Sequence, residues 1–442
     1  MASMSSNKQI PTHVVLGVLA FLVSILFAAM VPFGNNPDEA AHWDNIRLIS
    51  TTKRLPVFVP PPGRAPLPEN VLSSIQRATG MTELPEGALS RDEAHQPPMF
   101  YLLAAILKVL GGDFLVIRLL SAVLAGVTVA YCCKWIGTQF GDDFVRPLGA
   151  FLCVLPVQAQ LGGAVSNDAL THLLCAIIIG EALTVIRSKN VELRALILLG
   201  VAITAGLYAK LTVLQLLPWL VIVAAVYKIK SAGLTVKFCS QFAMMLVGVG
   251  ILTAPMWLRN LSLYADPLAR TIYVATGPNF SPADIEKVAG WSHADYIRQV
   301  AVRSLASFWY FVHPNTPLSR FAGEPLPFVG IMFVITPALV GIIRALRDPQ
   351  NRVNVPLMSA LLLVPIVIMP FYYAFISQVF QAQGRYFLPA LLPISVLTIV
   401  GWKHLSKLQW LAYTPAVILG LLTIKQLLGG GFASQRSNVA MF

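Results

Sequence analysis

Long apolar runs alternate with short polar turns along almost the whole chain. Because a helix needs roughly 20 apolar residues to cross the hydrocarbon core of a bilayer, each run predicts a membrane-spanning helix. We count eleven such runs, with a range of ten to thirteen, and expect an all-α bundle. The predicted spans cover about residues 11–33, 115–135, 145–162, 168–187, 194–209, 211–227, 238–258, 325–346, 354–376, 386–402 and 409–427.

Two long polar stretches interrupt this series, at residues 34–96 and 259–324. The first is followed by the apolar segment 97–110, which would make a helix only about 21 Å long. That length falls short of the roughly 30 Å core of a bilayer, so we expect juxtamembrane helices in these stretches, not further spans. The segment 299–313 is kept out of the count as well, and residues 1–442 are expected to form one integral membrane module.

The basic residues give the predicted bundle an orientation. Lys and Arg are concentrated in the turns on one side of the membrane, which is the cytoplasmic side by the positive-inside rule. The N-terminus is therefore expected to be cytoplasmic and both long stretches external. The rule is satisfied at every cytoplasmic turn only if 97–110 and 299–313 do not cross. The basic residues of these turns are Lys134, Arg146, Arg187, Lys189, Arg194, Lys228, Lys230, Lys237, Arg344, Arg347, Arg352, Lys403 and Lys407.

The composition agrees with a membrane protein and excludes a nucleic-acid-binding one. Hydrophobic residues make up 56% of the chain and charged residues only 12%, against about 25% in a typical soluble protein. The net charge is +12, but the basic residues form no stripe interleaved with aromatic residues. The five cysteines lie in or beside apolar runs, so neither a disulfide framework nor a zinc site is expected.

The first candidate site follows the first span directly. Asp38, Glu39 and His42 emerge together at the membrane surface, where ionisable groups cost free energy unless they are paired, hydrated or used. Paired acids after a proline can serve as a general base, as metal ligands or as the cap of a helix, and these interpretations stay open. Glu39 and His42 lie three residues apart and would share one face of a helix.

Two further motifs lie beside predicted membrane helices on the same external face. Asp168, preceded by Asn167, heads a span, so it is either a helix cap or a second acid that faces the first. His95 and Gln96 precede two prolines, which fix the direction in which the chain enters the next helix. That direction could aim both side chains at a site, although a lone histidine in such a place is more often structural.

Three cations of the external face are candidates for binding a phosphate. Lys210 lies between two spans and Arg259 opens the second polar stretch; anchoring in the lipid interface is the alternative for both. Arg385 belongs to a Gln-Gly-Arg-Tyr motif, in which the glycine permits close backbone approach and the arginine can grip a phosphate with two hydrogen bonds. Gln383 and Tyr386 complete this motif, and Tyr386 also suits the aromatic belt of a membrane surface.

Taken together, these motifs resemble those of the GT-C superfamily of membrane glycosyltransferases, which use sugars linked to a polyprenyl phosphate. The similarity is to the single-module architecture of the aminoarabinose and protein O-mannosyl transferases, and to related bacterial membrane proteins with Pro-Asp-Glu-x-x-His in the first loop. It covers about residues 30–395. The motifs are Pro37-Asp38-Glu39-Ala40-Ala41-His42, His95-Gln96-Pro97-Pro98-Met99-Phe100-Tyr101, Ser166-Asn167-Asp168-Ala169-Leu170 and Gln383-Gly384-Arg385-Tyr386.

The resemblance implies an inverting transfer of a sugar from a polyprenyl-phosphate donor to a glycan, lipid or polymer acceptor, on the external face of a bacterial inner membrane. Asp38 would accept the acceptor's proton, with Glu39 orienting it and Asp168 as the second acid. Some family members hold a divalent cation, Mg²⁺ or Mn²⁺, at the acidic pair. The expected substrate contacts are His42, His95, Gln96, Asn167, Gln383 and Tyr386, with Lys210, Arg259 and Arg385 as clamps on the donor phosphate.

Two other classes of function remain open at this stage. A transporter or flippase of lipid-linked sugars would be expected to show inverted repeats and ionisable residues near the middle of the membrane. The sequence shows no such repeat, and Glu181 is the only acid well inside a predicted span. A scaffold subunit of an envelope assembly is the third alternative, and it predicts that Asp38 is dispensable.

Overall fold

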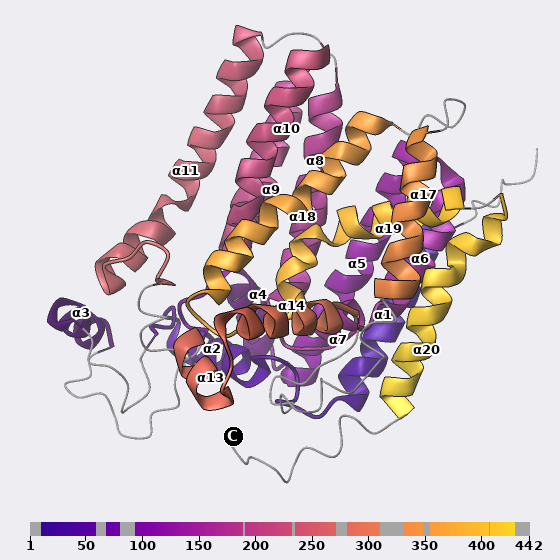
Figure 1. Cartoon of the computed structure of the whole chain (residues 1–442). Coiled ribbons are helices and arrows are strands. Elements are labelled where there is room, and N and C mark those ends of the chain that lie inside the picture. The colour runs from indigo at the N-terminus through magenta and orange to yellow at the C-terminus, as the bar shows by residue number, and fades with distance from the viewer. Residues whose placement is uncertain are drawn as a thin grey trace, which may run out of the picture.

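In the residues that it describes, the computed structural model of the chain is built from helices and connecting segments (Figure 1). These residues are 10–58, 68–79, 93–188, 191–231, 235–270, 281–309, 331–347, 354–405 and 407–428. Parts of both long polar stretches, including 59–67, 80–92, 271–280 and 310–324, lie outside them.

The first half of the chain contains α1 (Thr12–Met30), α2 (Glu39–Thr52), α3 (Glu69–Thr79), α4 (Met99–Val109), α5 (Phe114–Phe140), η1 (Asp142–Phe144), α6 (Val145–Val154), α7 (Pro156–Gly162), α8 (Asp168–Arg187), α9 (Leu193–Ala209) and η2 (Leu211–Gln215). The second half contains α10 (Leu216–Ser231), α11 (Val236–Tyr264), α13 (Pro282–Ala289), α14 (His293–Trp309), η3 (Ile331–Ile335), α17 (Thr336–Arg347), α18 (Val355–Ile376), η4 (Gly384–Ala390), α19 (Leu391–Leu405), η5 (Gln409–Tyr413) and α20 (Thr414–Leu428).

Within the described residues, seven helices are long and apolar enough to cross a membrane, or eight if the bent pair α6 and α7 is one span. The chain is therefore an all-α multi-pass membrane protein, as predicted. The sequence-based count of eleven is higher because the predicted spans 194–209 and 409–427 are shorter helices here, namely α9 and η5 with α20. Of the predicted span 325–346, residues 325–330 lie outside the described residues, and η3 and α17 form the rest. At 17 residues, α9 is about 26 Å long, at the lower limit for a span.

The two segments that were kept out of the count are indeed short or amphipathic helices. The segment 97–110 contains α4, which has only 11 residues. The segment 299–313 begins within α14, which is not among the candidate spans. Both polar stretches therefore hold juxtamembrane helices, with α2 and α3 in the first and α13 and α14 in the second.

Small residues allow the spanning helices to pack closely. A Cβ atom on Gly17 of α1 would lie only 2.8 Å from the carbonyl oxygen of Gly126 on α5, and a Cβ on Gly126 would lie 2.7 Å from the oxygen of Gly17. Glycines at such crossings let two backbones touch, which is the usual way in which helices associate inside a membrane. This contact holds the first half of α1 against α5.

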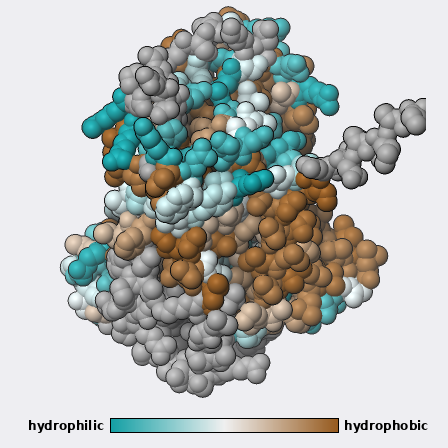
Figure 2. All heavy atoms as spheres, turned by 90° about the vertical axis from the view of Figure 1, so that its right-hand side faces the viewer, coloured by the Kyte–Doolittle hydropathy of each residue, from teal (hydrophilic) through white to brown (hydrophobic). Residues whose placement is uncertain are grey.

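The outer surface of the bundle is apolar over large areas. Val18 of α1, Ile251 of α11 and Leu421 of α20 are more than half exposed. Figure 2 shows a broad hydrophobic area on one face of the molecule, with hydrophilic residues gathered above it. Such a surface is compatible with lipid and not with water, because soluble monomers rarely expose apolar patches of this extent.

The short helices gather at one end of the bundle. Figure 1 shows α2, α4, α13 and α14 at its lower end, with α14 lying across the ends of the longer helices. α14 packs against η4, and α2 packs against α4. This end also holds the start of α8 and the end of α9, so chain segments far apart in the sequence meet there.

Candidate active site

Asp38 occupies the position immediately before α2, in the turn that follows α1. Its backbone φ of 56° lies in the left-handed region, which aspartate tolerates better than most residues. The side chain makes no capping hydrogen bond to α2, so capping is not its role. Instead the carboxylate accepts a hydrogen bond from Nη2 of Arg385, 347 positions away in the sequence, while 36% of the side chain stays exposed.

Four charged side chains form a row in which the signs alternate. Beyond its bond to Asp38, Arg385 places Nη1 3.6 Å from Oδ2 of Asp168. The other oxygen of Asp168 accepts a hydrogen bond of 2.5 Å from Nζ of Lys210. Asp168, Lys210 and Arg385 are each less than a tenth exposed, and the alternation compensates for the cost of removing these charges from water.

The backbone at Gly384 fixes the position of Arg385. A Cβ atom on Gly384 would lie 2.3 Å from the backbone nitrogen of Phe308 and 2.5 Å from the backbone oxygen of Ser304, both on α14. Backbone atoms of a helix cannot move aside, so only glycine fits here. The backbone nitrogen of Gly384 also donates a hydrogen bond of 2.7 Å to Oγ of Ser307. α14 is therefore the support on which Arg385 is held.

Glu39, the neighbour of Asp38, belongs to a different cluster. It is fully buried, and Arg118 of α5 donates to both of its oxygens, at 2.8 and 2.7 Å. The backbone nitrogens of Val165 and Gly34 donate to the same carboxylate at 3.0 and 2.9 Å. Arg118 also donates to backbone oxygens at the end of α1, including that of Ala28 at 2.6 Å. Both oxygens of Glu39 are thus occupied, which makes it a structural residue that holds the turn before Asp38.

A cavity of about 200 Å³ opens beside the charged row. Its wall combines charged and polar groups with apolar side chains, which is the usual composition of a small-molecule site. It brings together six of the residues that the sequence proposed, five from three separate motifs and the sixth the isolated Lys210. The lining residues are Asp38, Glu93, His95, Gln96, Lys210, Leu211, Thr212, Leu214, Gln215, Leu268, Arg270, Phe371, Tyr372, Phe375, Arg385 and Tyr386.

The groups around the cavity that lie outside the spans have shifted pKa values. Burial alone would raise the pKa of Asp38, but the guanidinium of Arg385 outweighs it and holds the pKa below its ordinary value. Burial, and next the charge of Asp38, raise the pKa of Glu93 to about 8. Burial, and next the charge of Lys210, lower the pKa of His95 to about 4. At neutral pH the cavity therefore holds an ionised Asp38, a protonated Glu93 and a neutral His95.

His42 and Asn167 are buried next to the row and keep polar atoms without a partner among the described residues. Nδ1 of His42 lies 2.8 Å from the hydroxyl of Tyr101, whereas Nε2 has no hydrogen bond. Burial lowers the pKa of His42 to about 4, so the ring is neutral. Neither amide atom of Asn167 has a partner. Buried polar groups are rarely left unsatisfied, so these atoms mark places where water or a ligand would bind.

Six of the twelve residues proposed from the sequence do not line the cavity, and two of these, Arg259 and Gln383, are bonded to other parts of the chain. Nη2 of Arg259 donates to the backbone oxygen of Pro56 at 2.5 Å, next to the hydrogen bond between the Phe58 nitrogen and the Tyr264 hydroxyl. Arg259 thus links α11 to the segment after α2, and it is not among the residues that line the cavity. Gln383 donates from Nε2 to Oε1 of Gln381 at 3.0 Å, and the same oxygen accepts a hydrogen bond from the Tyr386 hydroxyl at 3.1 Å.

Three other residues of this region escaped the sequence reasoning. Arg270 lines the cavity, donates one hydrogen bond to the backbone oxygen of Ala374, and has no carboxylate partner within the described part of the chain. No local pattern distinguished Arg270 or Glu93. Arg118, by contrast, had a signal, because a lone cation in an apolar span is expected to be paired or functional.

The acidic pair does not form a metal-binding pair. Asp38 faces the cavity and Arg385, while both oxygens of Glu39 are taken by Arg118 and backbone donors. Among the described residues, no three side chains of the His, Cys, Asp and Glu types converge as metal ligands would. The donor set therefore does not fit the divalent cation that the resemblance allowed at Asp38 and Glu39.

The fold and the site define a multi-pass α-helical membrane protein with a charged cavity at one end of its bundle. Comparison of the sequence with models of known protein families gives no match, and comparison with curated proteins gives none. Two solved structures of ArnT from Cupriavidus metallidurans, one in the apo state and one bound to undecaprenyl phosphate, are similar over 94% of this chain and 78% of theirs. Their TM-scores are 0.42 and 0.43, and both are 14% identical to this chain.

Proposed function

We propose that this chain is a membrane glycosyltransferase that moves a sugar from a polyprenyl-phosphate donor to a hydroxyl-bearing envelope acceptor, with inversion at the anomeric carbon. The observation that carries the proposal is the direct pairing of Asp38 with Arg385 across 347 positions of sequence, at a cavity that also contains Lys210. Residues from three of the four motifs that resemble the GT-C superfamily thus line one cavity, and Asp168 of the fourth motif pairs with Lys210 and Arg385 beside it. This end of the bundle is expected to be external.

Asp38 is the proposed base. The acceptor oxygen attacks the anomeric carbon from the side opposite the phosphate, its proton passes to the carboxylate of Asp38, and the bond from the anomeric carbon to the phosphate oxygen breaks. In the structure Arg385 keeps Asp38 ionised but weakly basic. A donor phosphate that binds Arg385 draws this guanidinium away from Asp38 and so increases the basicity of the carboxylate when the substrate is in place.

Cations beside the cavity suit the leaving group. The departing polyprenyl phosphate gains negative charge in the transition state, and fixed positive groups stabilise that charge. Lys210 and Arg385 line the cavity but are already paired with carboxylates, whereas Arg270 is not. We infer that Arg270 contacts the phosphate first, with Arg385 and Lys210 completing the clamp. Apolar residues such as Phe371 and Phe375 on the same wall would lie against the prenyl chain.

The test is transfer of labelled sugar from polyprenyl-phosphate sugars to envelope acceptors by purified protein in vesicles. We compare the wild type with Asp38→Asn, which keeps the shape and the hydrogen bond to Arg385 but removes the proton acceptor. Loss of a general base lowers turnover by about 10²- to 10⁴-fold. Asp44→Asn is the matched control, because Asp44 lies on α2, the helix that follows Asp38, is 41% exposed and does not line the cavity.

The outcomes separate the classes of function. Transfer by wild type and Asp44→Asn, with almost none by Asp38→Asn, supports the enzyme and its base together. Equal transfer by all three removes Asp38 from the chemistry. If no variant transfers sugar but vesicles move lipid-linked sugar between leaflets, the protein is a transporter.

A further inference from the structure

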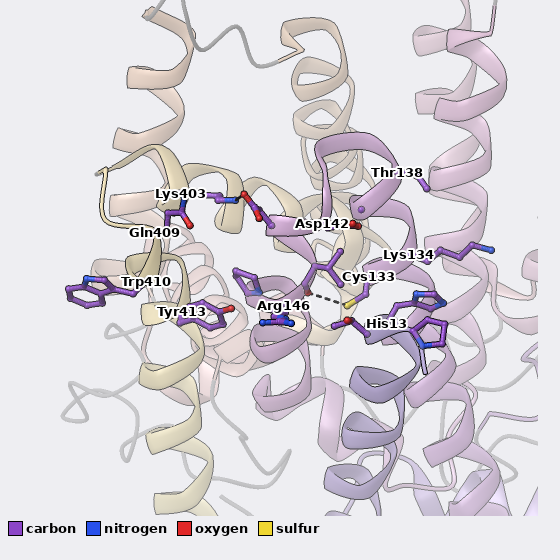
Figure 3. A pocket seen from close by; sticks show the side chains of 16 residues that line it. His13, Cys133, Lys134, Thr138, Asp142, Arg146, Lys403, Gln409, Trp410 and Tyr413 are labelled. Carbon is purple, nitrogen blue, oxygen red and sulfur yellow. Dashed lines mark hydrogen bonds and ion pairs between the residues drawn. The ribbon is translucent and has the colours of Figure 1, made fainter. Parts of the chain in front are cut away.

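A second hollow, of about 910 Å³, lies at the opposite end of α1 from Asp38. Here the start of α1, the end of α5, the start of α6, the end of α19 and η5 come together (Figure 3). The charge pattern of the sequence places this end in the cytoplasmic leaflet. Its polar lining residues are Thr12, His13, Lys134, Thr138, Asp142, Asp143, Arg146, Lys403, Gln409 and Tyr413.

One pair of charges in this hollow is already satisfied. Nζ of Lys403 lies 3.4 Å from Oδ2 of Asp143 and 4.0 Å from the centre of the Phe144 ring. Asp142 and Arg146 differ from this pair: both are exposed, and neither has an ion pair within the described residues. They lie four positions apart without binding each other. Figure 3 shows Arg146 between Tyr413 and His13, with Asp142 above it.

Arg146, which lines the hollow, is followed on α6 by a partly exposed apolar strip. The residues of this helix that are not buried are Arg146, Ala150 and Val154, which recur every four positions and therefore share one face. The strip begins with a cation and goes on with two small apolar side chains. Every other residue of α6 is buried.

Neighbouring helices flank this strip. A Cβ on Gly149 would lie 2.4 Å from Cδ1 of Leu16, so α6 and α1 are in close contact. On the side of α20, Oγ1 of Thr423 donates a hydrogen bond of 2.9 Å to the backbone oxygen of Val154. α1 and α20 both carry exposed apolar side chains, among them Val18 and Val417. α6 thus contacts both α1 and α20 and keeps one face partly exposed, with a charged residue at one end and apolar side chains along the rest. We call this partly exposed face the groove. Its combination of charged and apolar residues suits an amphiphile better than a free ion.

We propose that this groove binds one phospholipid with a zwitterionic headgroup, whose phosphate contacts Arg146, whose primary ammonium contacts Asp142, and whose acyl chain lies over Ala150 and Val154. Basic pockets between membrane helices on the cytoplasmic side are known places for lipid headgroups. Within the described residues neither Asp142 nor Arg146 has an ion pair, so a headgroup with both charges would satisfy the two, whereas a purely anionic one would face Asp142. Lys134 also lines the hollow, and Figure 3 shows it on the other side of His13 from Arg146. Tyr413 and Trp410 at the rim suit the interfacial level of such a headgroup.

Native mass spectrometry of the purified protein tests the site, with phosphatidylethanolamine, phosphatidylglycerol and phosphatidylcholine supplied in equal amounts. The wild type is expected to retain phosphatidylethanolamine. Arg146→Gln lowers that retention about fivefold, the usual effect of one cation near a charged lipid. Asp142→Asn shifts the preference to phosphatidylglycerol, because the repulsive acid is gone. Arg194→Gln and Glu192→Gln are matched controls, since both residues are exposed at the start of α9 and outside the hollow.

A second variant separates a lipid groove from a site for a soluble anion. Ala150→Phe fills the apolar strip and leaves both charges in place, so it should abolish retention as well. Free phosphoethanolamine should not displace the lipid at equal concentration. Equal retention by wild type, Arg146→Gln and Asp142→Asn overturns the proposal, as does undiminished binding by Ala150→Phe. A wild-type preference for phosphatidylglycerol overturns the headgroup assignment.

Discussion

Two carboxylates that are neighbours in the sequence have opposite surroundings. Glu39 is fully buried, with protein donors on both oxygens, and its guanidinium partner, Arg118, also binds the end of α1. Asp38 is paired with Arg385 but remains 36% exposed at a cavity. We call Glu39 and Arg118 the closed cluster, because it has no capacity for a ligand. We call Asp38, Arg385, Asp168 and Lys210 the open cluster, because Asp38 faces a cavity that a ligand could enter. Charge and burial alone therefore do not identify a reactive carboxylate. What distinguishes Asp38 is that part of its hydrogen-bonding capacity is not used by protein groups.

The backbone explains how the two neighbours are separated. Asp38 adopts φ of 56°, and α2 begins with Glu39 at the next position. The left-handed residue turns the chain, so that the two side chains leave it in different directions. One of them reaches α5, and the other reaches η4. The closed cluster thereby holds the turn on which the open cluster depends.

Breaking the closed cluster should have the largest effect on the folded state. Arg118→Gln leaves the buried charge of Glu39 uncompensated, and removal of one partner of such a pair typically costs about 3–5 kcal/mol. We expect a large fall in thermal stability and in the yield of folded protein, measured by fluorescence-detected size exclusion. Arg385→Gln is the comparison, because it should abolish transfer while changing stability less. Equal losses of stability in Arg118→Gln and Arg385→Gln would show that the two clusters contribute equally to the folded state, contrary to this comparison.

Gly384→Ala should disturb the open cluster through its support. The added methyl group overlaps backbone atoms of α14, and overpacking of this kind usually costs about 1–3 kcal/mol. The strain is relieved by a movement of η4, which shifts Arg385 away from Asp38. We therefore expect a large fall in the rate of sugar transfer with only a modest loss of stability. Gly248→Ala is the control, since a Cβ there meets nothing within 4 Å. Normal transfer by Gly384→Ala would show that the position of Arg385 tolerates movement.

Two arginines at the edge of the open cluster should behave differently. Arg270→Gln removes the unpaired cation of the cavity, so the KM for the donor rises about tenfold, as expected for one hydrogen bond to a charged group, while kcat changes little. Arg259→Gln removes a bond to the backbone of Pro56 and a contact with the Tyr264 hydroxyl, both outside the cavity lining, and should leave the KM unchanged. Steady-state kinetics with a water-dispersed short-chain donor measure both. The reverse result would restore the sequence-based assignment of Arg259.

Much of the fold followed from hydrophobic periodicity, because the length of an apolar run depends only on local sequence. Even the exclusion of 97–110 and 299–313 as spans agrees with α4 and α14. The sequence also proposed Asp38, Asp168, Lys210 and Arg385, which the structure brings into one row. Their order in that row was not accessible, since it depends on how α8, α9 and η4 meet.

The remaining residues of the site were out of reach for different physical reasons. Asp38 and Glu39 are adjacent acidic residues, and the sequence does not distinguish their roles. Only the backbone turn between them decides which one faces the cavity. Arg259 and Arg270 are both cations near the end of α11. Tertiary packing, which the sequence does not show, places Arg270 and not Arg259 in the wall of the cavity. The sequence predicted that another part of the backbone approaches Gly384 closely. It did not predict that this part is α14, because nothing in the sequence of α14 indicates a contact with η4. Arg118 could have been found, because its position in an apolar span required a partner.

The smallest expected effect concerns protonation of the open cluster. Burial raises the pKa of Glu93 to about 8, so this carboxyl group is neutral below that pH and anionic above it. As the pH rises through 8, the cavity gains a negative charge close to Asp38, and binding of an anionic donor weakens. We expect the donor KM of the wild type to increase about fivefold between pH 7 and pH 9, the effect of one screened like charge at short range. Glu93→Gln cannot ionise and should keep a constant KM, while Glu69→Gln, an exposed acid of the same polar stretch, should follow the wild type. If Glu93→Gln shows the same increase as the wild type, then another group beside the row titrates, and Glu93 is not the acid that keeps the open cluster receptive to phosphate.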